Sequence, residues 1–316
     1  MNHGPASERA PSGRRYLSEL RSRVWSAPYI LLMLAVLFWS GNFIVGRAAT
    51  DVVPPVALAF WRWTAGLVIV SAIGWRHVAR DFDKLRSSWP ILLVLAALGI
   101  SVFNTFVYIG LHSTTALNAL LLQSAMPIVI LVLTFLLFGE RPGFAPSVGV
   151  VVSMAGVATI ASAGDWGTLA SLSFNAGDLW VLAAVGAYAL YSVLLRKRPD
   201  VHPLSFVVAT FALGALMLLP AYIYEHFVAG PLRPSLSAYL VIAYVAVFPG
   251  VLSYLFFNRG VELAGANRAG HFIHLMPIFG SVLAMLLLGE SIAAFHVVGG
   301  ILIAAGLLLA AAGRRS

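Results

Sequence analysis

The sequence predicts an all-α integral membrane protein with ten transmembrane helices, arranged as two inverted five-helix repeats. Three observations support this prediction: the composition, the spacing of apolar segments, and a repeat within the chain. Of the 316 residues, 60% are hydrophobic and 10% are charged, and the mean hydropathy is +0.91. Soluble domains are about half apolar and about a quarter charged, so the composition excludes an ordinary soluble globule.

Ten apolar segments are each long enough to cross a hydrocarbon core of about 30 Å as a helix. They cover residues 28–48, 54–75, 90–109, 115–138, 146–163, 178–195, 203–224, 237–257, 266–288 and 294–311. Almost no sequence remains for a soluble domain. We therefore divide the chain into a basic cytoplasmic tail (1–27), a first five-helix repeat (28–164) and a second five-helix repeat (178–312).

Lysine and arginine residues are concentrated in alternate connections between the apolar segments. Of the 20 Lys and Arg residues, 17 lie in the two termini or in every second connection. Basic connections mark the cytoplasmic side of a membrane protein, so both termini are predicted to be cytoplasmic. The net charge of +8 therefore reflects topology, and we expect no nucleic-acid partner. The chain has no cysteine, which excludes disulfides and thiolate metal sites.

One apolar segment occurs twice in the sequence. The stretch MPIVILVLTFLLFGE (126–140) and the stretch MPIFGSVLAMLLLGE (276–290) are identical at nine of fifteen positions and start 150 residues apart. A unit with an odd number of spans must place its second copy upside down in the membrane. Inverted repeats that enclose a site near the bilayer midplane are a common plan of secondary transporters. The repeat is therefore the main functional signal in this sequence.

Three motifs resemble those of EamA-type permeases, which belong to the drug/metabolite transporter (DMT) superfamily. They are FWSGNFIVGR (38–47), FWRWTAG (60–66) and MP…LLFGERP (126–142). The resemblance extends over almost the whole chain after residue 28. It implies ten helices in two inverted units, alternating access, and usually export of amino acids or other small metabolites across a bacterial inner membrane. The second half departs from the first at Arg62, because Phe211 occupies the corresponding position.

Polar and aromatic side chains recur at corresponding positions of the two halves and predict a substrate pathway. Such groups are costly inside a bilayer and usually face a cavity or a partner helix. The alternative is that the aromatic residues anchor the protein at the interface and the amides only bond a neighbouring helix. The predicted pathway residues are Trp39, Asn42, Asn104, Tyr108, Tyr188, Tyr191, Tyr254, Asn258, His271 and His274.

His271 and His274 also raise the question of a metal site. They lie three residues apart, but no carboxylate or thiol accompanies them, so we predict no metal ion there. An imidazole that faces a cavity is able to change its charge near neutral pH. Proton exchange through histidine and simple facilitated export both fit the sequence.

Arg62 lies eight residues inside its span, which is about 12 Å deep in a helix. An Arg at the centre of a span costs about 2.5–3.5 kcal/mol on insertion scales, so it requires carbonyl groups, water or an anion as partners. A structural Arg would tie helix ends together, whereas a functional one would hold a substrate carboxylate. The resemblance to EamA-type permeases favours the structural role, because members of that family frequently carry an Arg at this position whatever they transport.

Several repeated residues are interpreted as structural. Pro127 and Pro277 are predicted to kink their helices, because proline removes an internal hydrogen bond. Glu140 and Glu290 end their spans, as solvated charges or inter-helix contacts. Four glycines are predicted to permit close helix packing: Gly149, Gly156, Gly299 and Gly306.

The absence of several motifs narrows the function. The sequence contains no nucleotide-binding G-x-x-x-x-G-K-[ST], no H-E-x-x-H and no G-x-S-x-G. We therefore expect no catalysis, no cofactor and no metal, and we expect a small-molecule substrate and the lipid bilayer as partners. The predicted function is a secondary transporter that exports amino acids or related metabolites. A lipid-linked sugar flippase or sugar-phosphate carrier is the nearer alternative, and an intramembrane enzyme using His271 and His274 the more distant one.

Overall fold

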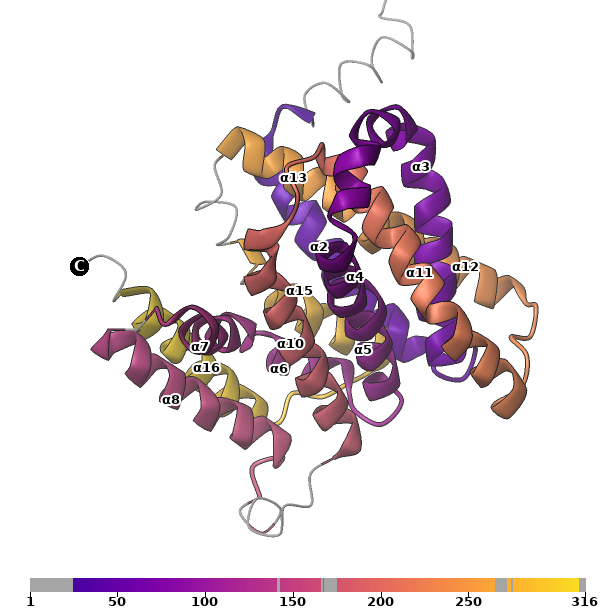
Figure 1. Ribbon diagram of the computed structural model, residues 1–316. Helices are drawn as coiled ribbons and strands as arrows, with labels where there is room; N and C mark the ends of the chain where they lie inside the picture. Colours follow the sequence, from indigo (N-terminus) through magenta and orange to yellow (C-terminus); the bar gives the residue numbers. More distant parts are fainter. Residues whose placement is uncertain are drawn as a thin grey trace, which may run out of the picture.

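The computed structural model describes residues 25–140, 143–165, 167, 175–264, 272–273 and 275–312. All regular structure within these residues is helical (Figure 1). Most of the predicted basic tail lies outside the described residues. So do two predicted pathway residues, His271 and His274.

The described residues of the first half form seven α-helices and one π-helix, several of which begin with proline. Proline suits a first helical turn because its missing N–H has no partner there. The elements are α2 (Pro28–Ala48), α3 (Pro55–Ser87), α4 (Trp89–Ala96), the π-helix η1 (Ala97–Val102), α5 (Phe103–Leu111), α6 (Ala116–Gln123), α7 (Met126–Phe138) and α8 (Phe144–Ala161).

The second half has a similar order of elements. They are α10 (Ala176–Leu194), the 3-10 helix η2 (Leu195–Lys197), α11 (Pro203–Val228), α12 (Leu236–Val245), the π-helix η3 (Ala246–Leu252), α13 (Ser253–Ala264), α15 (Met276–Leu283), the π-helix η4 (Ala284–Leu288) and α16 (Ala294–Ala312).

Six described helical segments are long and apolar enough to cross a membrane. They are Pro28–Ala48, Pro55–Ser87, Trp89–Leu111, Ala176–Lys197, Pro203–Val228 and Leu236–Ala264. The bent pair α6 and α7 is a seventh if it counts as one span, and three further apolar helices are shorter in the described part of the chain. The protein is therefore a multi-pass membrane protein, and the number ten stays a prediction.

The helices pack in pairs that join the two halves of the chain. The most extensive contacts are α8 with α16, α3 with α11, α5 with α10, and α2 with α13. In Figure 1, α7, α8 and α16 gather on one side of the molecule, and α3, α11 and α12 lie on the opposite side, with α2, α5 and α10 between them. The centre of the molecule is thus built from helices of both halves.

The α8–α16 pair is held by close backbone contact, as the glycine pattern predicts. A Cβ atom on Gly156 would lie 2.6 Å from the Gly299 carbonyl oxygen, and one on Gly306 would lie 2.5 Å from the Gly149 carbonyl oxygen. Side chains at these positions would therefore push the helices apart. Small residues allow such approach between membrane helices.

The α3–α11 pair is antiparallel, and each helix supplies a carboxylate to the first turn of the other. Glu225 accepts hydrogen bonds from the N–H groups of Val56 (3.0 Å) and Ala57 (2.7 Å). Asp81 accepts one from the N–H of His202 (2.9 Å). These carboxylates satisfy backbone donors that a helix leaves unpaired at its start, where the helix dipole also favours negative charge.

Pro127 does not bend a continuous helix from within. It lies in the first turn of α7, and the axes of α6 and α7 differ by 42° across the intervening break. Pro277 likewise lies in the first turn of α15. The missing proline N–H costs nothing at a helix start, so the described chain places a helix start at each proline.

Candidate functional site

A hydrogen-bonded cluster lies where α2, α3 and α5 meet. The guanidinium of Arg62 on α3 donates through Nη1 to Oδ1 of Asn42 on α2 and to the hydroxyl of Tyr108 on α5, the latter at 2.7 Å. The Tyr108 hydroxyl in turn donates to Asn42 Oδ1 at 2.8 Å. All three side chains are buried. We call these residues the Arg62 cluster; two of them, Asn42 and Tyr108, are predicted pathway residues.

The positive charge of Arg62 has no carboxylate partner among the described residues. The ion pairs among the described residues are those of Arg196 with Glu140 and of Arg259 with Glu262. The Cζ atom of Arg62 lies 4.7 Å from the centre of the Trp63 ring, which provides a cation–π contact. Arg62 is only 3% exposed, so water contributes little to its stabilisation. The cluster is thus a buried cation held by neutral groups.

Aromatic rings from the second half of the chain continue the site. The Tyr254 ring on α13 lies 6.0 Å from Trp39 and 6.3 Å from Phe211. Its hydroxyl is within electrostatic reach of both Arg62 and Tyr188. We call the rings of Trp39, Tyr188, Tyr191, Phe211 and Tyr254 the aromatic wall. The wall and the Arg62 cluster together form the candidate site.

Two π-helices adjoin this site and were not predicted. The π-helix η1 directly precedes α5, which carries Asn104 and Tyr108, and η3 directly precedes α13, which carries Tyr254 and Asn258. The Tyr191 ring lies against the backbone of η1, where a Cβ atom on Gly99 would approach it to 2.6 Å. Single turns of π-helix often occur at functional sites. The two π-helices occupy equivalent positions of the sequence repeat.

The remaining predicted pathway residues have different surroundings. Asn104 is buried, and its amide makes no hydrogen bond with any residue that the structure describes. Tyr191 is buried and lies 5.1 Å from the half-buried Tyr188. Asn258 is exposed on α13 and lies outside the site. The structure thus brings most of the described pathway residues together and leaves one apart.

A second polar network lies where α6, α10 and α16 begin, and sequence reasoning missed it. The buried Asp178 carboxylate accepts hydrogen bonds from the Thr114 hydroxyl and from the Asn118 amide (3.4 Å). Asn118 Oδ1 lies 2.9 Å from His296 Nε2, and His296 Nδ1 accepts from the Ala293 N–H at 2.9 Å. Because Nδ1 is an acceptor, Nε2 carries the proton and donates to Asn118.

Glu290 closes the same end of the molecule. Its carboxylate oxygens accept hydrogen bonds from the N–H groups of Ala116 and Leu117, both at 2.9 Å, in the first turn of α6. Glu290, Asn118 and His296 border a polar pocket of about 430 Å³. Of the two roles left open for Glu290, the inter-helix contact is the one observed.

Glu290 and Arg47 make different contacts from their repeat equivalents Glu140 and Arg196, which lie at the other end of the molecule. Arg47 Nη1 donates to the carbonyl oxygen of Leu111 at 2.6 Å, at the end of α5. Its counterpart Arg196 instead pairs with Glu140, the counterpart of Glu290, at 2.6 Å. The hydrogen bond from Arg196 lowers the pKa of the exposed Glu140 carboxyl below its usual range. At these repeat-equivalent positions, one end therefore has helix-end contacts and the other has a surface ion pair.

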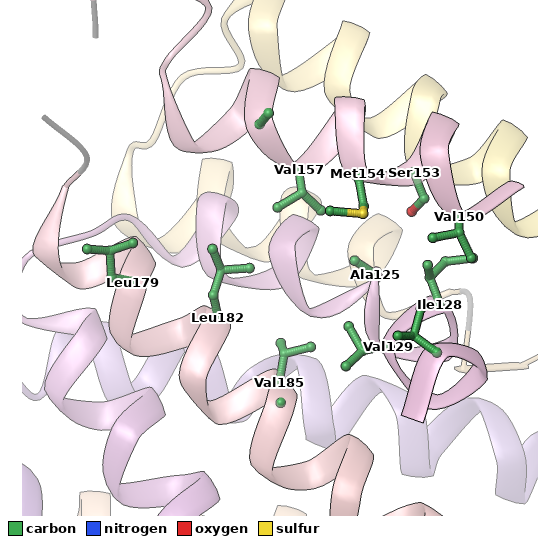
Figure 2. Close-up of a pocket in the computed structure, with 13 residues that line it drawn as sticks. Ala125, Ile128, Val129, Val150, Ser153, Met154, Val157, Leu179, Leu182 and Val185 are labelled. Atoms are coloured by element: carbon green, nitrogen blue, oxygen red, sulfur yellow. The ribbon is translucent and has the colours of Figure 1, made fainter. Parts of the chain in front are cut away.

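An apolar pocket of about 440 Å³ lies between α7, α8 and α10 (Figure 2). Figure 2 shows Ile128 and Val129 from α7, Val157 from α8, and Leu182 and Val185 from α10 pointing into it. None of the predicted pathway residues lines it. Its aliphatic lining suits a hydrocarbon group and offers little to orient a polar solute.

The described residues contain no group of three or more His, Asp or Glu side chains placed to hold a metal ion. The candidate site is built from one cation, neutral hydrogen-bonding groups and aromatic rings.

Comparisons with known proteins agree with this picture of the molecule. The model of the EamA-like transporter family matches residues 26–162 and again residues 175–312. An uncharacterized transporter of Archaeoglobus fulgidus is 28% identical over 292 residues, which are 91% of this chain and 98% of that protein. The uncharacterized transporter YyaM of Bacillus subtilis is 26% identical over 285 residues, 89% of this chain and 92% of the relative.

A solved crystal structure has the same fold. It superposes with a TM-score of 0.61 at 23% sequence identity and covers 92% of this chain and 98% of its own. Family membership itself rests on the two matches, which together span most of the sequence. The chain is therefore a membrane transporter that belongs to the EamA-like transporter family of the DMT superfamily.

Proposed function

We propose that this protein is a secondary transporter that exports small organic metabolites, such as amino acids, by alternating access. The observation that carries the proposal is the junction of the Arg62 cluster with the aromatic wall, at the seam between the two halves of the chain. Secondary transporters typically bind their substrates at such an interface between repeats. A few fixed polar groups among aromatic rings suit a small solute with one charged end.

The proposed cavity is enclosed by two inverted repeats, residues 28–164 and 178–312. The pairing of helices supports this arrangement, because α3 pairs with α11 and α8 with α16. Each pair is antiparallel and joins helices at equivalent positions of the sequence repeat. Two units related by a twofold axis in the membrane plane would pack in this way.

The difference between the two ends of the molecule supports alternating access. At one end Glu290 binds the start of α6 and Arg47 binds the end of α5. At the other end the equivalent Glu140 and Arg196 bind each other. In the proposed cycle, helix-end contacts form at one end while those at the other end are released. The solute path is then open to one side of the membrane at a time.

The proposed location is the bacterial inner membrane with both termini in the cytoplasm. The concentration of Lys and Arg in alternate connections supports this orientation. It assigns Glu290 to the outer face and Glu140 to the cytoplasmic face. With this orientation, the contacts of Glu290 and Arg47 would tie the outer ends of the helices together.

The alternative functions receive less support from the site. A carrier of sugar phosphates requires several cations to hold a dianionic phosphate. Arg62 is the one cation of the candidate site among the described residues. An intramembrane enzyme requires converging nucleophiles or metal ligands, and the described residues provide no metal-binding group.

Transport by purified protein in liposomes tests the proposal. Liposomes loaded with one unlabelled amino acid at a time should take up the same labelled amino acid faster than protein-free liposomes. At least one member of the panel should give such exchange, and Asn104→Ala should reduce it, because Asn104 is a buried amide without an internal partner. Ser87→Ala, at the exposed end of α3, is the control and should exchange normally. Absence of exchange for a broad metabolite panel would contradict the proposal.

A further inference from the structure

We infer that the Nε–Nη2 edge of Arg62 is a binding site for the carboxylate of the transported solute, which makes carboxylates with an apolar or aromatic side group the substrate class. The inference rests on the proposed transport function. It adds the chemical class of the solute and the atoms of Arg62 that bind it. It assigns Arg62 a functional role in addition to the structural one that the sequence favours.

Arg62 has more hydrogen-bond donors than partners. A guanidinium carries five N–H groups: two on each terminal nitrogen and one on Nε. Both groups on Nη1 are used, by Asn42 and Tyr108. Nε is buried without a partner. Nη2 is not fully buried, and the hydrogen bonds of Arg62 to residues in the described ranges come from Nη1 alone. Three donors are therefore free. A buried polar group without a partner costs about 1–3 kcal/mol.

The free donors on Nε and Nη2 lie in one plane along one edge of the guanidinium. This edge is one of the two that bind a carboxylate through a pair of parallel hydrogen bonds. Asn42 and Tyr108 hold the opposite corner of the group and thereby fix its orientation. The free edge is consequently preorganised, and a ligand would not have to order it.

The positive charge of Arg62 is not neutralised by a carboxylate among the described residues. Arg62 is 3% exposed. The carboxylates nearer the helix ends have other partners: the buried Asp178 binds Thr114 and Asn118, and the half-buried Glu225 binds the start of α3. A buried cation without a counter-ion is unfavourable. One bound carboxylate would neutralise it, and a single cation matches a single negative charge.

The surroundings of Arg62 indicate what else the solute carries. The Trp63 ring covers the guanidinium at 4.7 Å, and Trp63 packs against Phe211 with ring centres 4.6 Å apart. The Tyr254 ring, whose centre lies 6.3 Å from that of Phe211 and 6.0 Å from that of Trp39, connects this group to Trp39. Aromatic side chains favour apolar and ring-bearing partners. A solute with a carboxylate at one end and an apolar group at the other would contact both parts of the site.

A comparison of carboxylates with their amides tests the inference directly. The purified protein would be titrated with L-phenylalanine, L-leucine, hydrocinnamate and benzoate, and with the amide of each, while thermal stability is followed. We expect at least one carboxylate to raise the melting temperature and its amide to leave it unchanged. This comparison uses the unaltered protein, so it does not depend on whether a variant folds.

Variants then assign the effect to Arg62. Arg62→Gln should weaken binding of the active carboxylate about tenfold or more, since a hydrogen bond to a charged group contributes about 1.5–3 kcal/mol. Arg62→Lys keeps the charge but loses the paired donors and should weaken it as well. Arg76→Gln, the same change at an exposed position of α3, is the matched control and should bind normally.

Three results would overturn the inference: equal effects of a carboxylate and its amide, no effect of any carboxylate, or Arg62-dependent binding of inorganic phosphate alone. These results leave the proposed transport function intact if exchange in liposomes persists. Conversely, Arg62-dependent carboxylate binding without any exchange would retain the site and contradict transport.

Discussion

The Glu140 carboxylate and the Arg196 guanidinium form an ion pair at 2.6 Å between the end of α7 and the end of α10. The two residues are the sequence equivalents of Glu290 and Arg47, which bind helix ends at the opposite side of the molecule. The same pair of residue types thus makes two different sets of contacts in one structure. A transporter that exchanges these sets between its ends would change which side is open.

The ion pair gives a pH dependence with a defined sign. The Arg196 hydrogen bond lowers the pKa of Glu140, so the contact is complete above the usual carboxyl pKa of about 4.3 and is lost as pH falls through the lowered value. We expect the melting-temperature difference between the unaltered protein and Glu140→Gln to be constant from about pH 7 to pH 5 and to shrink below about pH 4. A difference that already vanishes near pH 6 would show that Glu140 is not held by Arg196.

The orientation of the two repeats is testable because the chain has no cysteine. Single cysteines at Glu140 and at Ser291, both exposed positions, need no background mutations. In intact cells a membrane-impermeant maleimide should label Ser291→Cys, whereas Glu140→Cys should react only after the membrane is opened. Labelling of both from the same side would refute the inverted arrangement.

Removing the charge of Glu290 should loosen the end at which α6 begins. Glu290→Gln keeps one acceptor oxygen, so it loses one of the two charge-assisted hydrogen bonds to Ala116 and Leu117 and weakens the other, and we expect a loss of about 1 kcal/mol in unfolding free energy. Thermal unfolding measures the effect, and a cysteine at Asn118 should react faster with maleimide in the variant.

Glu262→Gln is the control for this change. Glu262 forms an ion pair with Arg259 at 2.8 Å, but its side chain is 66% exposed, and surface ion pairs contribute little to stability. Equal destabilisation by the two substitutions would show that the contact of Glu290 with α6 has no special importance.

The glycines between α8 and α16 predict a strong difference between two Gly→Ala substitutions. Gly156→Ala places a methyl group 2.6 Å from the Gly299 carbonyl oxygen and should lower the melting temperature. Gly186→Ala meets no atom within 4 Å and should be neutral or stabilising, because alanine favours helix. A neutral Gly156→Ala would mean that the two helices are free to separate.

Sequence reasoning identified part of the candidate site because repeat positions and residue chemistry are local properties. Asn42 and Tyr108 followed from this reasoning, and the structure joins them through Arg62. The Asp178 network and the Glu225 contact were missed, because each depends on which helix ends meet in space. No spacing along one chain reveals that juxtaposition.

The helix breaks show a similar limit. A proline in an apolar segment predicts a disturbance of the helix. The sequence does not show whether the helix bends at the proline or a new helix starts there, because either arrangement accommodates the missing N–H. The structure has helix starts at Met126 and Met276. The π-helices were not predicted either, because a local change from α- to π-type hydrogen bonding leaves no recognisable residue pattern in the sequence.

The contact between α8 and α16 restricts how this protein can evolve. The atom that obstructs a side chain at Gly156 is the carbonyl oxygen of Gly299, and the atom that obstructs one at Gly306 is the carbonyl oxygen of Gly149. A larger residue at either site would meet this backbone oxygen in addition to the side chain of Ile303 or Ser153, so a smaller neighbouring side chain alone would not make room for it. Divergence at these four positions would require the two helices to adopt a new spacing in concert.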